Sequence, residues 1–317
     1  MKIAIIGAGV IGLSTGIELL NKGYNVTIYA RELAGITSDV AAAIWMPFKI
    51  EPQEQAIKWA LQSLPLFKKI NLEAPQAGVQ FKPHTNLCTT ATEKPAWVEY
   101  LEPLPNPDYV LDKYKTHSYT IKTAVIDPIK YMPYLRQLYL AKGGIIQQKE
   151  ISDIHALVKN HNLVVNCTGL NARTLVNDIT LYPIRGHVIR CEKIPGFDAS
   201  IVREDDELTH IITRTEDCLL GGVVQKDNWN MQPDKNTRDA IIARAHEIYP
   251  FAKQFKIIQE MIGLRPGRSP VRLELERIDD AHVIIHNYGH GGAGYTVSWG
   301  CAQEVARLTA EFLNNLK

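Results

Sequence analysis

A strand, a glycine turn and a helix open the chain. Lys2–Ile6 is a short apolar run, Gly7–Gly12 has the spacing G-x-G-x-x-G, and Val10–Asn21 carries apolar residues at helical intervals. Tyr24–Tyr29 has the pattern of a second strand. Strands joined through a helix normally pair in parallel with a right-handed crossover. The pattern predicts a dinucleotide site, because these glycines allow a tight turn, close approach of backbone to pyrophosphate, and close helix packing.

The end of the second strand leaves the identity of the dinucleotide open. An acidic residue is expected there to bind ribose hydroxyls, and this chain has Arg31 followed by Glu32. Arg31 suits a ribose phosphate, as in enzymes that use NADP. It suits equally an FAD phosphate, with Glu32 on the ribose. These two residues alone do not separate the two cofactors.

In the middle of the chain, a proline-rich stretch with weak periodicity is followed by residues with regular helix and strand patterns. The 317 residues, 45% of them hydrophobic, suffice for two domains or for one domain with a large insertion. Residues 47–123 contain many prolines and weak periodicity, which predicts irregular structure. A helix is expected from Asp127 and Pro128 to Ala141, followed by strands at Ile145–Gln148 and Leu163–Val165.

The second half of the chain predicts a sheet of another kind. Runs rich in β-branched residues between His187 and Val224, separated by polar turns, are typical of antiparallel strands. A helix is expected at Lys235–Tyr249. After it come a strand at His282–His286, a glycine-rich loop up to Gly294, and a helix at Val297–Leu316. Two glycine loops far apart in sequence suggest a long ligand.

Charge and cysteine content exclude several functions. Lys and Arg number 35 against 34 Asp and Glu, so the net charge of +1 provides no field to attract nucleic acid or an anionic membrane. The apolar start is too short to span a membrane and lacks a signal-type cleavage region, which predicts a cytoplasmic protein. No metal site or disulfide framework is expected, because the five cysteines are scattered: Cys88, Cys167, Cys191, Cys218 and Cys301.

Three segments together resemble the D-amino-acid oxidase and D-aspartate oxidase family: Thr37–Pro47, Gly263–Pro266 and His286–Gly294. Further motifs stand in the family's order and extend the resemblance over almost the whole chain, namely Asn166–Gly169, Arg185-Gly186, Leu220–Gly222 with Gln225 and Trp229, and Arg268–Glu274.

The resemblance implies an α/β fold in two parts. A Rossmann-like FAD-binding domain would comprise residues 1–47, 145–185 and 258–317, and an α+β substrate domain with a largely antiparallel sheet would comprise 48–144 and 186–257. It further implies that FAD lies along a set of residues that contribute partly through their backbone: Gly7, Ala8, Gly9, Val10, Ile11, Gly12, Arg31, Glu32, Thr37, Ser38, Ala42, Ala43, Ile44, Glu150, Thr168, Gly291, Gly292, Gly294 and Thr296.

The resemblance also implies the chemistry, which is oxidative deamination of a D-amino acid. Arg265 matches the family arginine that grips the substrate α-carboxylate, a task suited to a planar fork of donors. With the α-carbon held against flavin N5, hydride transfer requires no metal and no triad. The imino acid would hydrolyse to a 2-oxo acid and ammonia, and oxygen would yield hydrogen peroxide. Activity should rise with pH, because a neutral amine is the better hydride donor. The resemblance is compatible with a homodimer.

Substrate contacts are expected from Met46, Gly292, His210 and Arg203 besides Arg265. His210 replaces the family's substrate-binding tyrosine; it can still donate one hydrogen bond, and a charge gained near neutral pH would favour anionic substrates.

Arg203 resembles the arginine with which D-aspartate oxidases bind the side-chain carboxylate, although the acidic run 203–207 is also typical of a solvated loop. Val224 stands where those enzymes carry a further arginine. A neutral D-amino acid is therefore the first expectation. The alternatives are a D-aspartate or D-glutamate oxidase, a glycine or sarcosine oxidase, and, from another class, an NAD(P)-binding dehydrogenase or nucleotide sensor.

Overall fold

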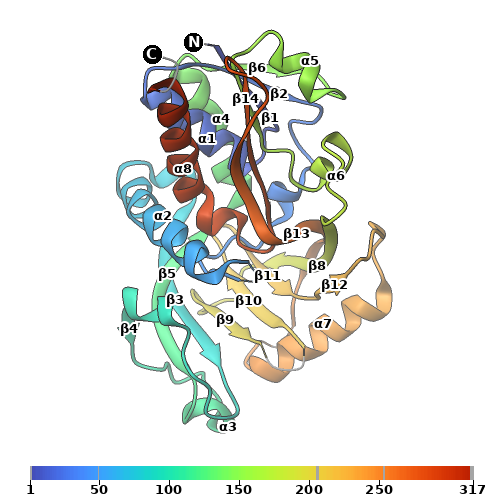
Figure 1. Ribbon diagram of the computed structural model, residues 1–317. Coiled ribbons are helices and arrows are strands. Elements are labelled where there is room, and N and C mark those ends of the chain that lie inside the picture. The colour runs from blue at the N-terminus through green and yellow to red at the C-terminus, as the bar shows by residue number, and fades with distance from the viewer. Residues whose placement is uncertain (1, 49, 205–206, 253, 315–317) are drawn as a thin grey trace.

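One continuous sheet runs through the molecule, and its two halves differ in strand direction (Figure 1). The structure is a computed structural model that describes residues 2–48, 50–204, 207–252 and 254–314. Within these residues the order of neighbouring strands is β4 (Glu102–Leu104), β5 (Tyr119–Ile126), β3 (Val79–Leu87), β9 (Ser200–Arg203), β10 (Thr209–Thr213), β11 (Asp217–Gly221), β8 (Tyr182–Glu192), β13 (Ile257–Arg277), β14 (Val283–His290), β7 (Leu163–Asn166), β1 (Lys2–Ile6), β2 (Asn25–Ala30) and β6 (Ile145–Gln148), while β12 (Gln225–Lys226) pairs with β8 beside this path.

The parallel half confirms the strand, helix, strand unit predicted at the start of the chain. Strand β1 lies between β2 and β7, β6 pairs with β2 and β14 pairs with β7, and all four pairings are parallel. Helix α1 (Val10–Asn21) connects β1 to β2. The carboxyl ends of these strands therefore meet at one edge of the sheet, directly above the antiparallel half in Figure 1.

Helices cover both faces of the parallel half. Side chains of β1 alternate: Ile3 and Ile5 pack with α1, α4 (Pro128–Ala141) and α8 (Gly294–Asn314), whereas Ala4 and Ile6 pack with α5 (Ile154–Val158). This alternation follows from the two-residue period of a strand. The predicted helix at 128–141 is confirmed, with the Asp127 carboxylate accepting a hydrogen bond from the Ile129 N–H as its N-cap.

The antiparallel half confirms the sheet predicted from the β-branched runs. Strand β8 pairs with β11, β11 with β10 and β10 with β9, all antiparallel. Helix α7 (Lys235–Ile248) packs on it through Ile241, Ala245 and Ile248. Strand β3 then joins β9 in parallel and continues the sheet to β5 and β4.

Strand β13 connects the two halves, and no element had been expected over its 21 residues. It pairs antiparallel with β8 on one side and with β14 on the other. Pro266 and Pro270 argue against a central strand, because proline lacks the N–H that a ladder needs. Pro270 falls in the irregularity where the register with β14 shifts between Gly267 and Arg272, and Pro266 lies just before it, opposite Pro183 of β8.

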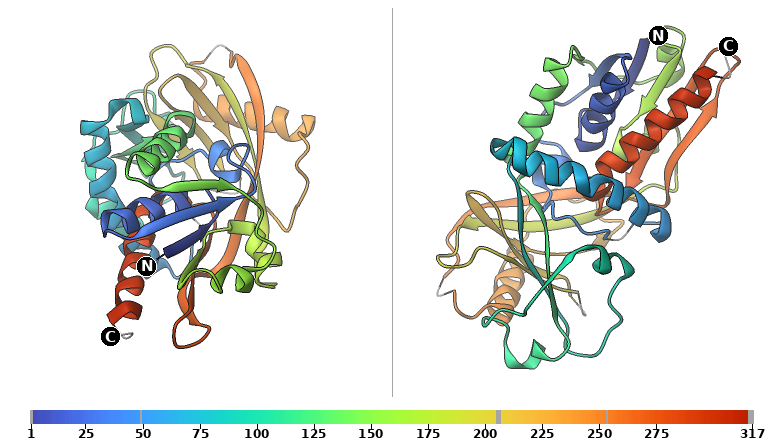
Figure 2. Two further views of the ribbon diagram at one scale, coloured as in Figure 1. Left: turned by 90° about the horizontal axis from the view of Figure 1, so that it is seen from above. Right: turned by 90° about the vertical axis from the view of Figure 1, so that its left-hand side faces the viewer.

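The expectation of irregular structure over residues 47–123 is wrong. These residues contain the 21-residue helix α2 (Gln53–Glu73), the short helix α3 (Asp112–Lys115), and strands β3, β4 and most of β5. Helix α2 continues through Pro65, at a cost of about 3 kcal/mol. It is stabilised by one buried face, which includes Trp59, Leu64 and Phe67. Tertiary packing outweighs the local signal here, and α2 crosses the side of the molecule where the two halves meet (Figure 2).

The glycine-rich segment after residue 286 is shorter than expected. Strand β14 continues to His290, because β13 pairs with it as far as Gly267↔His290, and helix α8 begins at Gly294 rather than at Val297. Only residues 291–293 remain as a turn. This tight connection brings the start of α8 to the same edge of the sheet as the start of α1.

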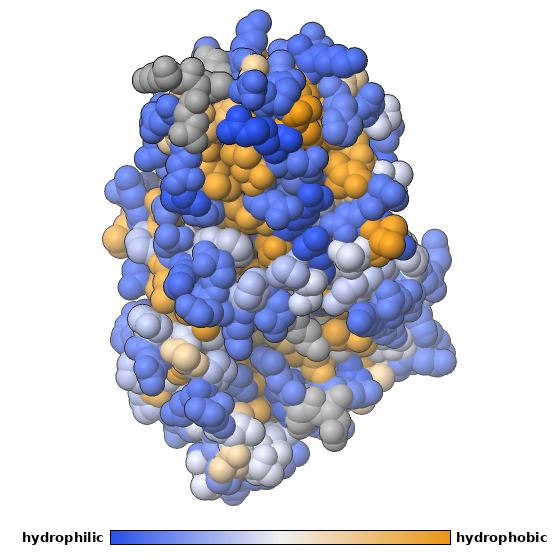
Figure 3. Space-filling model, in the orientation of Figure 1, coloured by the Kyte–Doolittle hydropathy of each residue, from blue (hydrophilic) through white to orange (hydrophobic). Residues whose placement is uncertain are grey.

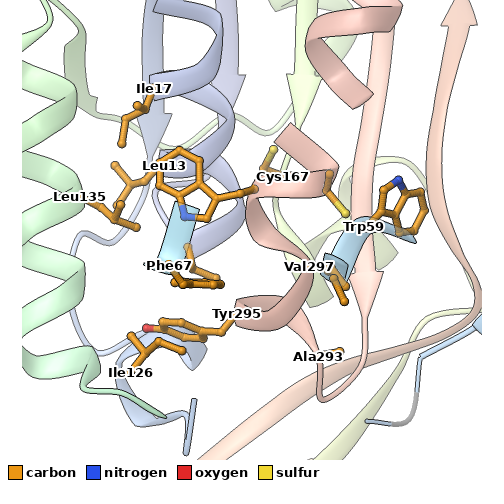
Figure 4. Packing of buried hydrophobic residues seen from close by; sticks show 14 of the residues in the cluster. Leu13, Ile17, Trp59, Phe67, Ile126, Leu135, Cys167, Ala293, Tyr295 and Val297 are labelled. Carbon is orange, nitrogen blue, oxygen red and sulfur yellow. The ribbon is translucent and has the colours of Figure 1, made fainter. Parts of the chain in front are cut away.

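The main core lies among α1, α2, α4 and α8 (Figure 4). Leu13 and Ile17 of α1 face Leu135 of α4, while Trp59 of α2 lies beside α8. Helices α2 and α8 approach so closely that a Cβ on Gly300 would lie 2.2 Å from the carbonyl oxygen of Trp59. Glycine is therefore required at this crossing.

No helix among the described residues is long and apolar enough to cross a membrane. In the same part of the chain, no three His, Cys, Asp or Glu side chains gather as metal ligands would. All five cysteines are free thiols, and Cys167, Cys191, Cys218 and Cys301 are buried.

Candidate active site

A single cavity of about 760 Å³ extends from the parallel strands to the antiparallel sheet. One end lies at the carboxyl ends of β1, β2 and β6, and the other lies on β8, β10 and β13. The structure brings most of the expected site residues together around it: Gly7, Ala8, Gly9, Val10, Ile11, Arg31, Glu32, Thr37, Ser38, Ala42, Ala43, Ile44, Met46, Glu150, Thr168, His210, Arg265, Gly291, Gly292 and Gly294.

The glycine turn presents bare backbone at the start of α1. Gly9 caps the helix without any side-chain hydrogen bond, and the Val10 N–H donates to Ser38 Oγ at 3.1 Å. Gly7 has φ +110°, and a Cβ there would lie 2.4 Å from the carbonyl oxygen of Cys167. Gly12 does not line the cavity; its absent Cβ would meet the Gly7 oxygen at 1.9 Å. Gly12 therefore shapes the turn instead of touching a ligand, and the helix N-terminus is open to an anion.

Arg31 lies between two carboxylates at the far end of the cavity. Its Nε is 3.2 Å from Glu32 Oε1, and its Nη1 is 3.3 Å from Glu150 Oε1. The hydrogen bond to Glu150 and the charge of Glu32 raise the pKa of Arg31. Two acids at this point suit ribose hydroxyls and repel a third phosphate, so the geometry favours FAD over NADP.

The segment before α2 forms one wall of the cavity. Ala43 has φ +52°, an uncommon conformation for alanine, and its carbonyl accepts a hydrogen bond from the Ile126 N–H at 2.8 Å. Thr296 lies behind this wall rather than on the cavity. Its Oγ1 accepts from the Met46 N–H at 3.1 Å and lies 3.0 Å from the Met46 oxygen, so it holds the segment in place.

Thr168 and Thr37 are held by their own partners. Thr168 donates both its N–H and its hydroxyl to Asn166 Oδ1, at 3.2 and 2.8 Å. The Thr37 hydroxyl donates to the Leu264 oxygen of β13 at 3.2 Å. Both side chains are thereby fixed at the cavity edge.

Arg265 is the charged group of the antiparallel end. Its guanidinium rests on Gly186, where a Cβ would lie 2.8 Å from Cζ, and its Nη1 donates to the Val223 oxygen at 3.2 Å. Burial lowers the pKa of Arg265 to about 10, so the group stays charged at neutral pH. No carboxylate of the described chain lies within 4.0 Å of it. An uncompensated cation at a cavity wall calls for an anionic ligand.

His210 lies in the same wall but is not a charge switch. It is buried, and its Nε2 has no hydrogen-bond partner among the residues that the structure describes. Burial, together with the charges of Arg265 and Arg244, lowers the pKa of His210 to about 3. The expectation that it gains a charge near neutral pH is therefore wrong, because desolvation and two nearby cations both oppose protonation.

Arg203 points away from the cavity. Its Nη1 donates to the Tyr114 hydroxyl at 3.1 Å and lies 3.3 Å from Glu247 Oε2 of α7. Residues 205 and 206 of the acidic run lie outside the described residues. Arg31 and Arg265 are the only lysines or arginines among the described residues that line the cavity.

Other lining residues were not singled out from the sequence. Val188, Val202, Ile212 and Ile262 make the wall around Arg265 apolar. Two of them could have been found from the two-residue period of a strand. Ile212 lies on the same strand face as His210, and Val188 lies on the same face as Gly186.

Shape and donors together fit FAD. The cavity is long, it passes the N-terminus of α1, whose N-cap Gly9 has no side chain and which suits a pyrophosphate, and it ends between carboxylates suited to ribose hydroxyls. Gly294 at the start of α8 has no atom within 4 Å of where a Cβ would stand, so the backbone there is open to the cavity.

Comparison with known proteins gives one consistent result. The family model described as "FAD dependent oxidoreductase" (DAO) matches residues 2–308. A D-amino-acid oxidase from Rubrobacter xylanophilus is 34% identical over 99% of this chain and 97% of its own length. One from Dictyostelium discoideum is 38% identical over 100% of this chain and 93% of its own. A glycine oxidase from Bacillus cereus shares the fold, with a TM-score of 0.80, 19% identity, and coverage of 98% of this chain and 95% of its own.

Proposed function

This chain belongs to the D-amino-acid oxidase family of FAD-dependent oxidoreductases, and we propose that D-amino acids with neutral side chains are its preferred substrates. It is an oxidoreductase that catalyses FAD-dependent oxidation of D-amino acids. The products are a 2-oxo acid, ammonia and, from oxygen, hydrogen peroxide. When bound, FAD supplies the acceptor for the hydride of the substrate α-carbon and passes the electron pair to oxygen.

The observation that carries the choice of substrate is the isolation of Arg265. It is the one lysine or arginine at the antiparallel end among the described lining residues, and the surrounding wall is apolar. One cation holds one carboxylate, which every α-amino acid has. A second carboxylate on the substrate side chain would find neutral His210 and apolar groups instead.

Arg265 would orient the substrate through its planar fork of N–H donors. His210 would donate one hydrogen bond to the same carboxylate from a neutral ring. Met46 and the backbone of Gly292 would complete the substrate enclosure. Arg203 would contribute to substrate binding only if it left Glu247 and Tyr114, so we assign it no contact in this arrangement.

The cofactor would lie along the remaining cavity. Gly7, Ala8 and Gly9 would receive the pyrophosphate at the start of α1, while Glu32 and Glu150 would bind the ribose end. Residues 42–44 and 291–294 would flank the ring end, opposite Arg265.

We propose that FAD and the substrate are bound mainly by two different parts of the chain. Residues 1–47, 145–185 and 258–317 would bind FAD, and residues 48–144 and 186–257 would form the substrate part. The two ends of the cavity support this, since the glycine turn comes from the first set and His210 from the second. Helix α4 is an exception to this division, because it belongs to the second set of residues but packs with α1 in the main core.

The test is peroxide formation by the purified, FAD-loaded protein with D-alanine, D-methionine, D-proline, D-aspartate, D-glutamate, glycine, sarcosine and the matching L-enantiomers. Turnover of neutral D-isomers, with kcat/KM well above that for D-aspartate, is expected. Exclusive turnover of D-aspartate or D-glutamate would refute the substrate proposal, and turnover of only glycine or sarcosine would make the protein an amine oxidase of another specificity.

A further inference from the structure

Two large apolar side chains at the cavity mouth are exposed to solvent. Trp229 is 54% exposed and Met231 is 50% exposed, and both line the cavity. They lie on the loop between β12 and α7. The face of the molecule drawn in Figure 3 is largely hydrophilic, with apolar residues scattered among polar ones. Single exposed apolar residues need no explanation, but two of them on one loop at the mouth of a binding cavity indicate a contact surface.

A buried arginine fixes this loop to the sheet. Arg185 of β8 is 2% exposed. Its Nε donates to the Asn230 oxygen at 2.6 Å, its Nη2 to the Gln232 oxygen at 2.8 Å, and its Nη1 to Gln225 Oε1 at 2.9 Å. A rigid fork of donors that binds two loop carbonyls holds the backbone on either side of Met231.

The loop is also ordered by its own side chains. Asn228 Oδ1 accepts from the Asn230 N–H and Asn230 Oδ1 accepts from the Gln232 N–H, each at 2.9 Å. The Asp227 N–H donates to the Pro183 oxygen at 2.8 Å. Such turns leave little freedom to the backbone, so Trp229 and Met231 are presented in a preformed arrangement.

The same short stretch of β8 supports Arg265. Arg185 pairs with Gln225 of β12 and Leu264 of β13, and the next residue, Gly186, carries the Arg265 guanidinium. Successive residues of a strand face opposite sides. The Arg185 side chain, which holds the loop, and the Arg265 guanidinium therefore lie on opposite faces of β8.

We propose that Arg185 is a positioning residue that holds Trp229 and Met231 over the substrate entrance, where these two side chains select D-amino acids with long apolar side chains. The inference rests on the proposed function, because it assumes that Arg265 holds the substrate carboxylate. A substrate carboxylate fixed on Arg265 leaves the side chain of a longer amino acid to extend towards the mouth.

The experiment compares D-methionine with D-alanine, whose methyl group is too short to reach the loop. Trp229→Ala is expected to lower kcat/KM for D-methionine about tenfold, mainly through KM, and that for D-alanine by less than about twofold. Met231→Ala should act in the same direction. Phe251→Ala is the matched control, because it removes another exposed aromatic side chain that does not line the cavity. It should leave kcat/KM unchanged for both D-methionine and D-alanine.

The role of Arg185 is separated from that of the loop side chains by hydrogen exchange. Arg185→Met should lower the D-methionine to D-alanine ratio as Trp229→Ala does, and should also speed amide exchange at residues 228–232, which Trp229→Ala leaves slow. If Arg185→Met does not fold, Arg185→Lys, which keeps the charge but loses the fork of donors, replaces it in the same two measurements.

Equal losses for both substrates, or an unchanged ratio with an altered oligomeric state, would overturn the inference while leaving the proposed function intact. A wild-type protein that oxidises no neutral D-amino acid would instead refute the proposed function itself.

Discussion

The guanidinium of Arg265 rests directly on the Cα of Gly186, with no room between them for a methyl group. A Cβ at residue 186 would lie 2.8 Å from Cζ, Nη1 and Nη2. In the pairing of β8 with β13, Gly186 lies opposite Gly263 and Arg265 lies opposite Ile184, two residues away on each strand. The position of Arg265, the proposed substrate-binding arginine, therefore depends on a glycine in the adjacent strand.

Gly186→Ala is expected to displace Arg265 and raise KM for D-alanine about tenfold or more, because small misplacement of an orienting group is costly. The end of a flexible side chain can move, so the free energy of unfolding should change little. Steady-state kinetics and urea unfolding measure the two effects. An unchanged KM would show that the arginine position tolerates a methyl group.

Removing the charge itself should have a larger effect. Arg265→Ala should lower kcat/KM for D-alanine by about a hundredfold or more, which corresponds to roughly 3 kcal/mol of lost transition-state binding. Arg265→Lys keeps the charge but loses the two-pronged geometry, so an intermediate value is expected. Near-wild-type kinetics of both variants would contradict the assigned role.

His210 should make the protein sensitive to mild acid. Its pKa falls from 6.5 in the unfolded chain to about 3 in the folded protein. Between these values the unfolded state binds the proton and the folded state does not, so the free energy of unfolding falls as pH drops below 6.5. His210→Gln should lose less stability between pH 7.5 and pH 5 than the wild type, as measured by urea unfolding. Equal losses would place the titrating group elsewhere, for example at His84 or His290, whose pKa values are also lowered by burial.

Gly12→Ala should weaken FAD binding without any contact to the cofactor. The added methyl would lie 1.9 Å from the Gly7 backbone oxygen, which cannot move without reshaping the turn. An increase of about tenfold or more in the Kd for FAD is expected, measured by titration of the cofactor-free protein. Ile17→Val, a core change in the same helix, is the control and should leave the Kd unchanged.

Thr296→Val should lower the free energy of unfolding by about 1–3 kcal/mol, because the Met46 N–H loses the Thr296 Oγ1 that accepts its hydrogen bond. Thr309→Val is the matched control in the same helix, since its hydroxyl only returns a hydrogen bond to the Val305 carbonyl four residues earlier. Urea unfolding of the cofactor-free proteins measures both. Equal effects would show that the bond to the 44–46 segment adds nothing.

Local patterns predicted those elements whose signals are local. The glycine turn after Lys2–Ile6, the Pro128 helix start and the β-branched runs of β8, β10 and β11 each follow from a spacing of a few residues, and the structure confirms them. Helix α2 was missed because Pro65 lowers its propensity, whereas its stability comes from burial against α8. Strand β13 was likewise not predicted, because its proline residues argue against a strand and its pairing with β8 and β14 is not a local signal.

The sequence by itself determined the family and the dinucleotide-binding glycine turn, and it pointed to Arg265 as the proposed carboxylate-binding residue, because motifs with fixed spacing carry these. Only the tertiary structure decided the charge of His210, the place of Arg203 outside the cavity lining, and the hydrogen bonds from Arg185 to the loop that carries Trp229. The physical reason is that burial and charge proximity arise between residues far apart in the chain. A pKa or a hydrogen bond of this kind exists only once β8, β10, β12 and β13 lie side by side.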